Sequence, residues 1–270
     1  MTYRLLSYNI KRGGRGREAQ IASVINGCAP DLVVLQEASD PEVVRCVAGE
    51  TGMQQWAARG GASLGFMSRR PVAGYAWHKP GISRHAFLEI QPAGTAARVF
   101  GVHLSAVHAA WTESRRIVEL RALLRAIAQH QEGFHVLTGD FNTLAPGEIL
   151  DFRKLPTRLR ALVWLSGGNV RWRTIQVVLD SGYIDAYRAT HPEGPGFTFP
   201  TWEPHVRLDY LFLPARYRAQ LNSCEIIDGS GTQAASDHLP LLSVVEIPAE
   251  AGEPEPTLEP QSQLEPDVYP

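Results

Sequence analysis

The sequence is poor in cysteine and contains no long hydrophobic run. Its 270 residues include three cysteines, Cys28, Cys46 and Cys224, without Cys-x-x-Cys spacing. This number and spacing argue against a disulfide framework and a thiolate zinc site, so we expect three small core residues. No apolar run approaches the roughly 20 residues of a membrane helix, and the first residues lack the pattern of a signal peptide. We therefore expect a cytoplasmic protein without integral membrane association.

A large excess of charge of one sign is also missing. Lys and Arg total 26 and Asp and Glu total 28, a net charge of −2, which argues against a protein that coats nucleic acid. The distribution is uneven, because residues 249–270 contain six acids, five prolines and no base. This composition predicts a disordered tail. The other 26 basic and 22 acidic residues give residues 1–248 a net charge of +4.

What is present is the composition of a globular chain, with 44% hydrophobic and 20% charged residues. Apolar runs bounded by turn residues predict strands, and apolar residues spaced three and four apart predict helices. The predicted strands lie at Tyr3–Asn9, Leu32–Leu35, around Phe66 and Tyr75, and at Ala86–Ile90, Arg98–Leu104, His135–Thr138, Arg207–Leu213, Cys224–Ile227 and Leu241–Ile247. The predicted helices are Arg17–Cys28, Val43–Gly49, a long one after an N-cap at Thr112, and Thr174–Ser181.

Helices placed among many short strands indicate an α/β layered domain at residues 1–248, with a basic helical insertion at about 151–182. Eight polar residues occur where the predicted strands begin or end. Singly, each would suit a turn or a helix cap, but strand ends in a sheet protein face a shared cleft. The set consists of Asn9, Glu37, His103, Asp140, Asn142, Asp209, Asp237 and His238.

Four carboxylates, two histidines and two asparagines together suit the hydrolysis of a phosphate ester. That reaction needs a hard cation on oxygen ligands, a group that deprotonates water, and a group that stabilises the leaving oxygen. Six segments that carry these residues resemble, in order, the motifs of the endonuclease/exonuclease/phosphatase superfamily. They are Leu6-Ser7-Tyr8-Asn9, Leu35-Gln36-Glu37, Gly101-Val102-His103, Thr138-Gly139-Asp140-Phe141-Asn142, Arg207-Leu208-Asp209-Tyr210 and Ser236-Asp237-His238-Leu239-Pro240.

The superfamily includes deoxyribonucleases, abasic-site endonucleases, neutral sphingomyelinases and inositol-polyphosphate phosphatases. The resemblance implies a four-layer α/β/β/α sandwich, in which two facing mixed sheets are flanked by helices. It implies that Glu37 is the principal ligand of a Mg²⁺ or Mn²⁺ ion, assisted by Asn9 and Asp237. It further implies that Asp140 orients or deprotonates the attacking water and that Asn142 holds a phosphate oxygen.

His238 and Asp209 resemble the His-Asp dyad of the family, which contacts the phosphate. A carboxylate partner raises the pKa of a histidine, which suits it to stabilise charge or transfer a proton. Either Asp140 or His238 is then the general base. His103 is expected to give a hydrogen bond or a proton to the phosphate or leaving oxygen. Arg84 resembles an arginine near the scissile phosphate, although a surface arginine fits the pattern equally well.

Lys11 departs from the family pattern, since many nuclease members have an acid two positions after the asparagine; this favours a single metal ion. The sequence thus predicts a metal-dependent hydrolase of phosphate esters, first of all a phosphodiesterase or endonuclease. A phosphatase or lipid phosphodiesterase is the alternative, and a non-catalytic binding module is disfavoured because the whole polar set is retained. The expected partner is a phosphodiester or phosphomonoester substrate, nucleic acid among them, with no obligate protein partner evident. The insertion at 151–182 could follow a phosphate backbone, touch lipid or pack on the sandwich.

Overall fold

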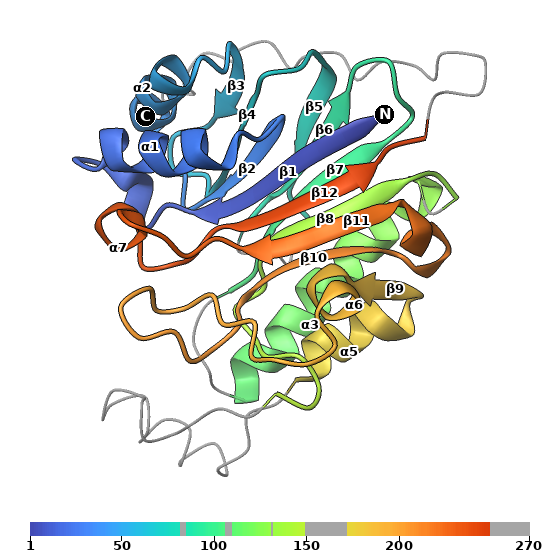
Figure 1. Ribbon diagram of the computed structural model, residues 1–270. Helices are drawn as coiled ribbons and strands as arrows, with labels where there is room; N and C mark the ends of the chain where they lie inside the picture. Colours follow the sequence, from blue (N-terminus) through green and yellow to red (C-terminus); the bar gives the residue numbers. More distant parts are fainter. Residues whose placement is uncertain (82–84, 106–109, 131, 149–171, 249–270) are drawn as a thin grey trace, which may run out of the picture.

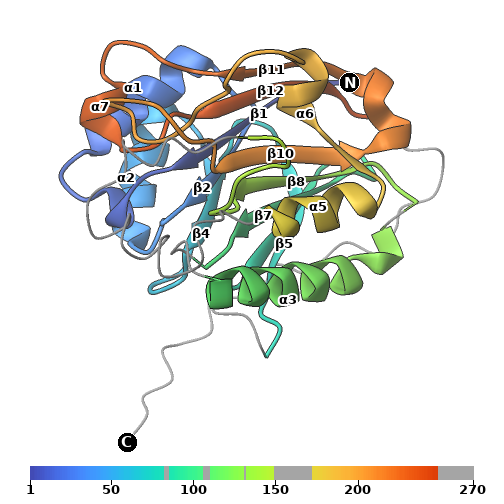
Figure 2. The ribbon, with the colours of Figure 1, turned by 90° about the horizontal axis from the view of Figure 1, so that it is seen from below.

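The computed structural model describes residues 1–81, 85–105, 110–130, 132–148 and 172–248 (Figure 1). Arg84, most of the basic insertion and the tail at 249–270 lie outside these ranges. Two six-stranded mixed sheets face one another, and helices cover their outer faces (Figure 2). The predicted α/β sandwich is therefore confirmed.

The first sheet contains both the first and the last strand of the described chain. Its strand order is β11-β12-β1-β2-β4-β3. β1 pairs in parallel with β2 and antiparallel with β12. The last strand therefore lies beside the first, in the middle of the sheet. The strands are β1 (Thr2–Asn9), β2 (Leu32–Gln36), β3 (Gln55–Ala58), β4 (Leu64–Ser68), β11 (Leu221–Ile226) and β12 (Leu241–Glu246).

The second sheet has the order β5-β6-β7-β8-β10-β9. β7 and β8 are parallel, and β10 lies antiparallel to β8. Apolar runs are buried on both faces of the central strands, as expected for a sheet between a second sheet and a helix layer. The strands are β5 (Val72–His78), β6 (Phe87–Pro92), β7 (Arg98–His103), β8 (His135–Asp140), β9 (Tyr183–Asp185) and β10 (Asp209–Pro214).

Helices close the sandwich on both sides. α1 (Glu18–Cys28) and α2 (Pro41–Thr51) form one apolar core with the first sheet. α3 (Ala110–Ala126) and α5 (Arg173–Asp180) form another with the second sheet. A third core fills the space between the sheets. The shorter elements are α6 (Ala186–Thr190), α7 (Thr232–Ala235) and the 3₁₀ turns η1 (Arg12–Gly14), η2 (Ala128–His130) and η4 (Ala215–Gln220).

Local chemistry sets the ends of α2. The Asp40 side chain accepts a hydrogen bond from the Glu42 N–H at 3.1 Å and Pro41 is the first helical residue, a favourable N-terminus. The helix ends at Gly52 with φ of 67°, a left-handed conformation that glycine adopts at little cost. Val43 and Val47 are buried on the side that faces the sheet, as the periodicity predicts.

Two details differ from the sequence prediction. Thr112 is not an N-cap, because α3 already includes Ala110 and Trp111. Cys46 is exposed on the outer side of α2, whereas Cys28 and Cys224 are buried core residues as predicted. None of the helices within the described ranges is long and apolar enough to cross a membrane.

The topology gathers strand ends from both sheets at one edge of the sandwich. The parallel strands β1 and β2 end there, and so do β7 and β8. The antiparallel strands β10 and β12 begin at the same edge, with Asp209 opposite Asp140 in the ladder. His103 is the partner of Asp140 on its other side. Polar residues far apart in sequence therefore meet at this edge.

Candidate active site

Asp140, at the end of β8, is the central buried carboxylate of this edge. Ligand atoms of Asp140, Asp209 and His238 lie within 4.8 Å of one another, and all three residues are buried. His238 Nδ1 is 2.8 Å from Asp209 Oδ2, a hydrogen bond that orients the ring. His238 Nε2 then lies 3.9 Å from Asp140 Oδ2. The ring of Phe199 packs against the His238 ring with 4.9 Å between centroids.

Asn9 and Glu37 extend the cluster to the other sheet. The Asn9 amide donates hydrogen bonds to Asp140 Oδ2 at 3.1 Å and to Glu37 Oε1 at 3.3 Å. Its oxygen accepts from the Lys11 backbone N–H at 3.0 Å, so the amide presents its NH₂ group to the carboxylates. The Ser236 hydroxyl donates to the Asn9 carbonyl at 2.6 Å. One buried asparagine thus joins both sheets at the site.

The backbone at the site adopts conformations that most residues avoid. Glu37, directly after β2, has φ of 56°, and Asn142, two residues after β8, has φ of 51°. Lys11 and Arg12 also lie in the left-handed region. Glu37 is held by the Arg12 N–H, which donates to Oε2 at 2.5 Å, and by the Gly13 N–H, which donates to its carbonyl at 2.9 Å. Such strain persists only where surrounding contacts fix it, and it is concentrated at functional sites.

His103 and Asn142 approach Asp140 from the side of β7. His103 Nε2 is 3.9 Å from Asp140 Oδ2, the same oxygen that His238 faces. The His103 ring stacks on the His85 ring at 4.9 Å with planes 8° apart. The Asn142 N–H donates to Asp140 Oδ1 at 2.8 Å, and its amide donates to the Leu104 carbonyl at 3.0 Å. Both oxygens of Asp140 therefore have defined neighbours.

The electrostatics of Asp140 and His238 follow from burial and from each other. Burial and the nearby charge of Asp209 raise the pKa of Asp140 from 3.8 to about 7, although His238 opposes the shift. Burial disfavours the charged form of His238, but Asp209 and then Asp140 outweigh it and raise the pKa of His238 to about 10. At neutral pH the histidine therefore carries a positive charge between two carboxylates.

Asp237, another residue of the predicted set, forms an ion pair beside the cluster. The carboxylate of Asp237 points to Lys11, with its Oδ2 3.3 Å from Nζ. The Asp237 carboxylate thus pairs with a lysine, whereas Glu37 accepts a hydrogen bond from the Asn9 amide. Arg84 lies outside the described residues. His85, its neighbour, was not among the predicted site residues, and a lone histidine before a strand carries no sequence signal of a stacked pair.

A buried ion network behind the site was also not predicted. Arg207, 1% exposed, lies 2.6 Å from Asp185 Oδ2 and 2.7 Å from Glu148 Oε1 and packs over the Tyr210 ring. The Tyr210 hydroxyl donates to the Thr143 carbonyl at 2.9 Å. These contacts tie the loop after Asp140 to the strand that begins with Asp209. Arg207 precedes β10 by two residues and lies in the same sequence motif as Asp209, which is a usable sequence signal, whereas nothing in the sequence marks Glu148.

Two hollows flank this edge. One, of about 290 Å³, is lined by Arg12, Glu37, His85 and His103 together with small residues of the β3–β4 loop. The other, of about 300 Å³, is lined by Lys11, Arg12, Arg15 and Arg17 and by residues 233, 234 and 236. Cations thus surround the outer side of a carboxylate-rich centre. This arrangement can hold an anion on its surface and a cation at its centre.

The donors at the centre fit a hard divalent cation. Glu37 and Asp140 present oxygens that are joined through one amide, and Asp209 adds a second buried carboxylate beside Asp140. Burial and then the charge of Asp209 raise the pKa of Asp140, and a cation placed beside these carboxylates would favour their ionised forms. Carboxylate oxygens are the ligands that Mg²⁺ and Mn²⁺ prefer.

Comparisons with known proteins bear on the family and the fold. A model of the Endonuclease/Exonuclease/phosphatase family matches residues 6–238. No sequence among the curated proteins matches the chain.

Solved structures show the same fold at low sequence identity. A variant of the 3′ phosphatase NExo from Neisseria, bound to a product DNA hairpin, is 19% identical over 90% of this chain and 99% of its own, with a TM-score of 0.70. An AP endonuclease from Archaeoglobus fulgidus is 17% identical over 91% and 100%, with a TM-score of 0.67. TDP2 from D. rerio, complexed with a single-strand DNA product, is 17% identical over 91% and 99%, with a TM-score of 0.63.

Proposed function

The chain belongs to the endonuclease/exonuclease/phosphatase family, and we propose that it is a divalent-metal-dependent phosphodiesterase that cleaves nucleic acid. The observation that carries the proposal is the buried Asp140–Asp209–His238 cluster, joined through Asn9 to Glu37. A cluster of this kind places a base, a cation and an electrostatic clamp around one small volume. Those are the parts that phosphate-ester hydrolysis requires.

Glu37 would hold the metal ion, with Asp140 as the nearest further oxygen ligand and Mg²⁺ or Mn²⁺ as the ion. Bound there, the ion would neutralise charge on the phosphate and its leaving oxygen. The Asn9 amide keeps the two carboxylates in place. Asp237, paired with Lys11, would act by positioning that lysine or as an outer ligand.

Asp140 is the residue that we assign to the attacking water. Its Oδ2 faces the open centre and accepts one hydrogen bond, from Asn9 at 3.1 Å, and its raised pKa gives it the proton affinity of a base at neutral pH. His238, held positively charged by Asp209, would stabilise charge on the phosphate. His103 would contact the phosphate or leaving oxygen, and Asn142 would hold a phosphate oxygen.

Nucleic acid is favoured as the substrate by charge that lies beyond the catalytic centre. The basic hollow lined by Lys11, Arg12, Arg15 and Arg17 adjoins Asp237 and suits a second phosphate next to the one that is cleaved. A polymer of phosphodiesters presents phosphates in such a row. The similar structures bound to DNA products are consistent with this substrate.

The test is a substrate panel with purified protein in Mg²⁺, in Mn²⁺ and in excess chelator. The panel contains plasmid DNA, single-stranded DNA, RNA, sphingomyelin, an inositol polyphosphate and bis(4-nitrophenyl) phosphate. We expect cleavage of nucleic acid that the chelator abolishes. Asp140→Asn and His238→Ala should each lower kcat by roughly 10²–10⁴-fold.

The matched control is Glu132→Gln, which removes an exposed carboxylate just before β8, at the opposite end of that strand from Asp140, and should leave kcat unchanged. Circular dichroism and the unfolding midpoint show whether each variant is folded. Activity that survives chelation, or that folded Asp140→Asn retains, would contradict the mechanism. Cleavage of lipid or inositol phosphate without nucleic acid would contradict the substrate and support a phosphatase or lipid phosphodiesterase.

A further inference from the structure

A groove between α3 and α5 has no role in the site described above. It has a volume of about 510 Å³ and is lined by residues 121, 124, 125 and 128 on one side and 177, 180 and 181 on the other. α3 leads from the end of β7 back to the start of β8, so its last turns lie at the opposite end of the sheet from Asp140. The groove is therefore remote from the catalytic centre.

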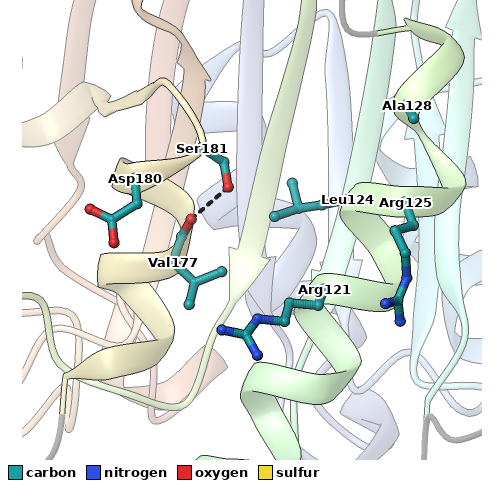
Figure 3. A pocket seen from close by; sticks show the side chains of 7 residues that line it. All are labelled: Arg121, Leu124, Arg125, Ala128, Val177, Asp180 and Ser181. Carbon is teal, nitrogen blue, oxygen red and sulfur yellow. Dashed lines mark hydrogen bonds between the residues drawn. The ribbon is translucent and has the colours of Figure 1, made fainter.

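The groove combines an apolar floor with a basic rim. In Figure 3, Leu124 of α3 and Val177 of α5 point toward each other across it. Both are half-buried and pack against the core of the second sheet. Arg121 and Arg125 lie one turn apart on α3 and are exposed. A ligand that fits this surface has an apolar group beside a negative charge.

The two arginines differ from their neighbours on the same helix. Arg115 and Arg116 form ion pairs with Glu119 and Glu113. Among the described residues, Arg121 and Arg125 form no ion pair, and the single acid of the groove, Asp180, accepts a hydrogen bond from Gln176 at 2.7 Å. The rim thus keeps positive charge available for a partner.

The chain itself contains a segment of complementary chemistry. Residues 249–270 carry six acids and no base, and within them a triplet occurs twice, as Leu258-Glu259-Pro260 and Leu264-Glu265-Pro266. Each triplet puts a leucine next to a glutamate, the combination that the floor and rim would accept. Proline restricts the free chain and lowers the entropy lost on binding.

The length of this segment allows it to reach the groove from Pro248. Leu264 lies sixteen positions beyond Pro248 in the sequence, which is roughly 50 Å of extended chain. A domain of 248 residues has a radius of gyration of about 18 Å, so the segment can pass around it. A tethered ligand also acts at an effective concentration on the order of millimolar, at which a weak contact is populated.

We propose that the Leu-Glu-Pro triplets of residues 249–270 dock in the α3–α5 groove of the same chain. The leucine lies on Leu124 and Val177, and the glutamate pairs with Arg121 and Arg125. Because the groove is remote from Asp140, docking leaves the catalytic centre open. The surface is an intramolecular interaction site and not a second active site.

Cross-linking of the full chain tests this placement. Arg125→Lys keeps the positive charge and supplies an amine that a zero-length carbodiimide reagent can join to a glutamate. Arg45→Lys, on exposed α2, is the matched control. We expect mass spectrometry to find position 125 linked to Glu259 or Glu265 at least tenfold more often than position 45.

Two further arms identify the contact and its source. The double variant Glu259→Lys/Glu265→Lys should abolish the cross-link. The double variant Glu253→Lys/Glu255→Lys, whose changes lie outside the triplets, should keep the cross-link. Samples that mix ¹⁴N and ¹⁵N protein should give links within one isotope only. Equal linking at positions 125 and 45 would overturn the proposal. So would a result in which position 125 is linked only to residues 250–255. Links between isotopes would show that a second copy supplies the segment, and would overturn docking within one chain.

Discussion

At the scale of single residues, Asp140 Oδ2 is the atom on which the site converges. Asn9 donates to it, and the Nε2 atoms of His103 and His238 both lie 3.9 Å away. Asp209 acts through His238 and through its own charge. Changing Asp209 should therefore alter the protonation of both Asp140 and His238.

The first prediction concerns Asp209→Asn. Asp209 raises the pKa of both Asp140 and His238, so removing its charge lowers both values. If ionised Asp140 and protonated His238 form the active state, both limbs of the pH profile of kcat/KM should move to lower pH. Initial rates between pH 5 and 10 measure this, with Glu132→Gln as the control. A profile whose maximum falls while both limbs stay at the same pH would contradict the roles assigned.

The second prediction concerns Glu89, which is buried beside Arg98 and His78 with contacts of 3.1 and 2.6 Å. Burial opposes its ionisation, but His78, His130 and Arg98 outweigh burial and hold the pKa of Glu89 below 4.5. Its contribution to stability is therefore complete above the unfolded-state pKa and is lost as the pH falls through the lowered value.

Glu89→Gln leaves buried Arg98 without its carboxylate, so we expect a loss of about 3–5 kcal/mol at pH 7. The difference from the unchanged protein should shrink between pH 7 and pH 3, as Glu89 itself takes up a proton. Urea unfolding at both pH values measures this. The exposed Glu193→Gln variant should show no such loss, and an equal loss at pH 7 and pH 3 for Glu89→Gln would count against the assigned charge.

At the scale of elements, the parallel pair β7–β8 depends on one glycine. Gly139 has φ of 147°, and a Cβ there would lie 1.9 Å from the Val102 carbonyl oxygen. Gly139 directly precedes Asp140, so the close approach of the two backbones also fixes the position of the Asp140 carboxylate. A side chain at this position would push the two strand ends apart.

The third prediction compares two glycine-to-alanine changes. Gly139→Ala should destabilise the protein by more than about 3 kcal/mol or prevent folding, through the backbone clash and the strained φ. Gly49→Ala, in α2 with no atom near a new Cβ, should be neutral or stabilise by up to ~1 kcal/mol. Unfolding midpoints and soluble yield measure both; similar yields and midpoints for the two variants would refute the close approach.

The strands and helices could be predicted from the sequence because each carries a local signal. The apolar run Leu32–Leu35 and the spacing of buried residues in α2 both indicate their elements directly. Pairing between sheets has no such signal, since Asn9 and Asp140 are 131 residues apart. Motif order supplied that information for the strand-end residues. It supplied none for Glu148 or His85, whose partners are set by tertiary packing.

At the scale of the whole molecule, the two sheets are joined at the site by Asn9 and by residues that precede β12. A cation bound between Glu37 and Asp140 would link strands of different sheets. Such a cation binds the folded chain and not the unfolded one, so it stabilises the fold by mass action.

The fourth prediction follows from that linkage. Mg²⁺ at a hundred times its dissociation constant should stabilise the protein by about 2.7 kcal/mol, and chelator should remove the gain. Glu37→Gln should lose most of this metal-dependent shift, and Glu193→Gln should keep it. Urea unfolding with and without metal measures the shift; an equal shift in Glu37→Gln would place the cation elsewhere.

The central position of β12 has a consequence for synthesis of the chain. β12 lies between β1 and β11 and follows directly on Asp237 and His238. A nascent polypeptide that has emerged only as far as residue 230 contains Asn9, Glu37, Asp140 and Asp209, but it lacks His238 and has a gap in its first sheet. This edge of the sandwich is therefore assembled last, so a growing or prematurely terminated chain lacks the complete polar cluster.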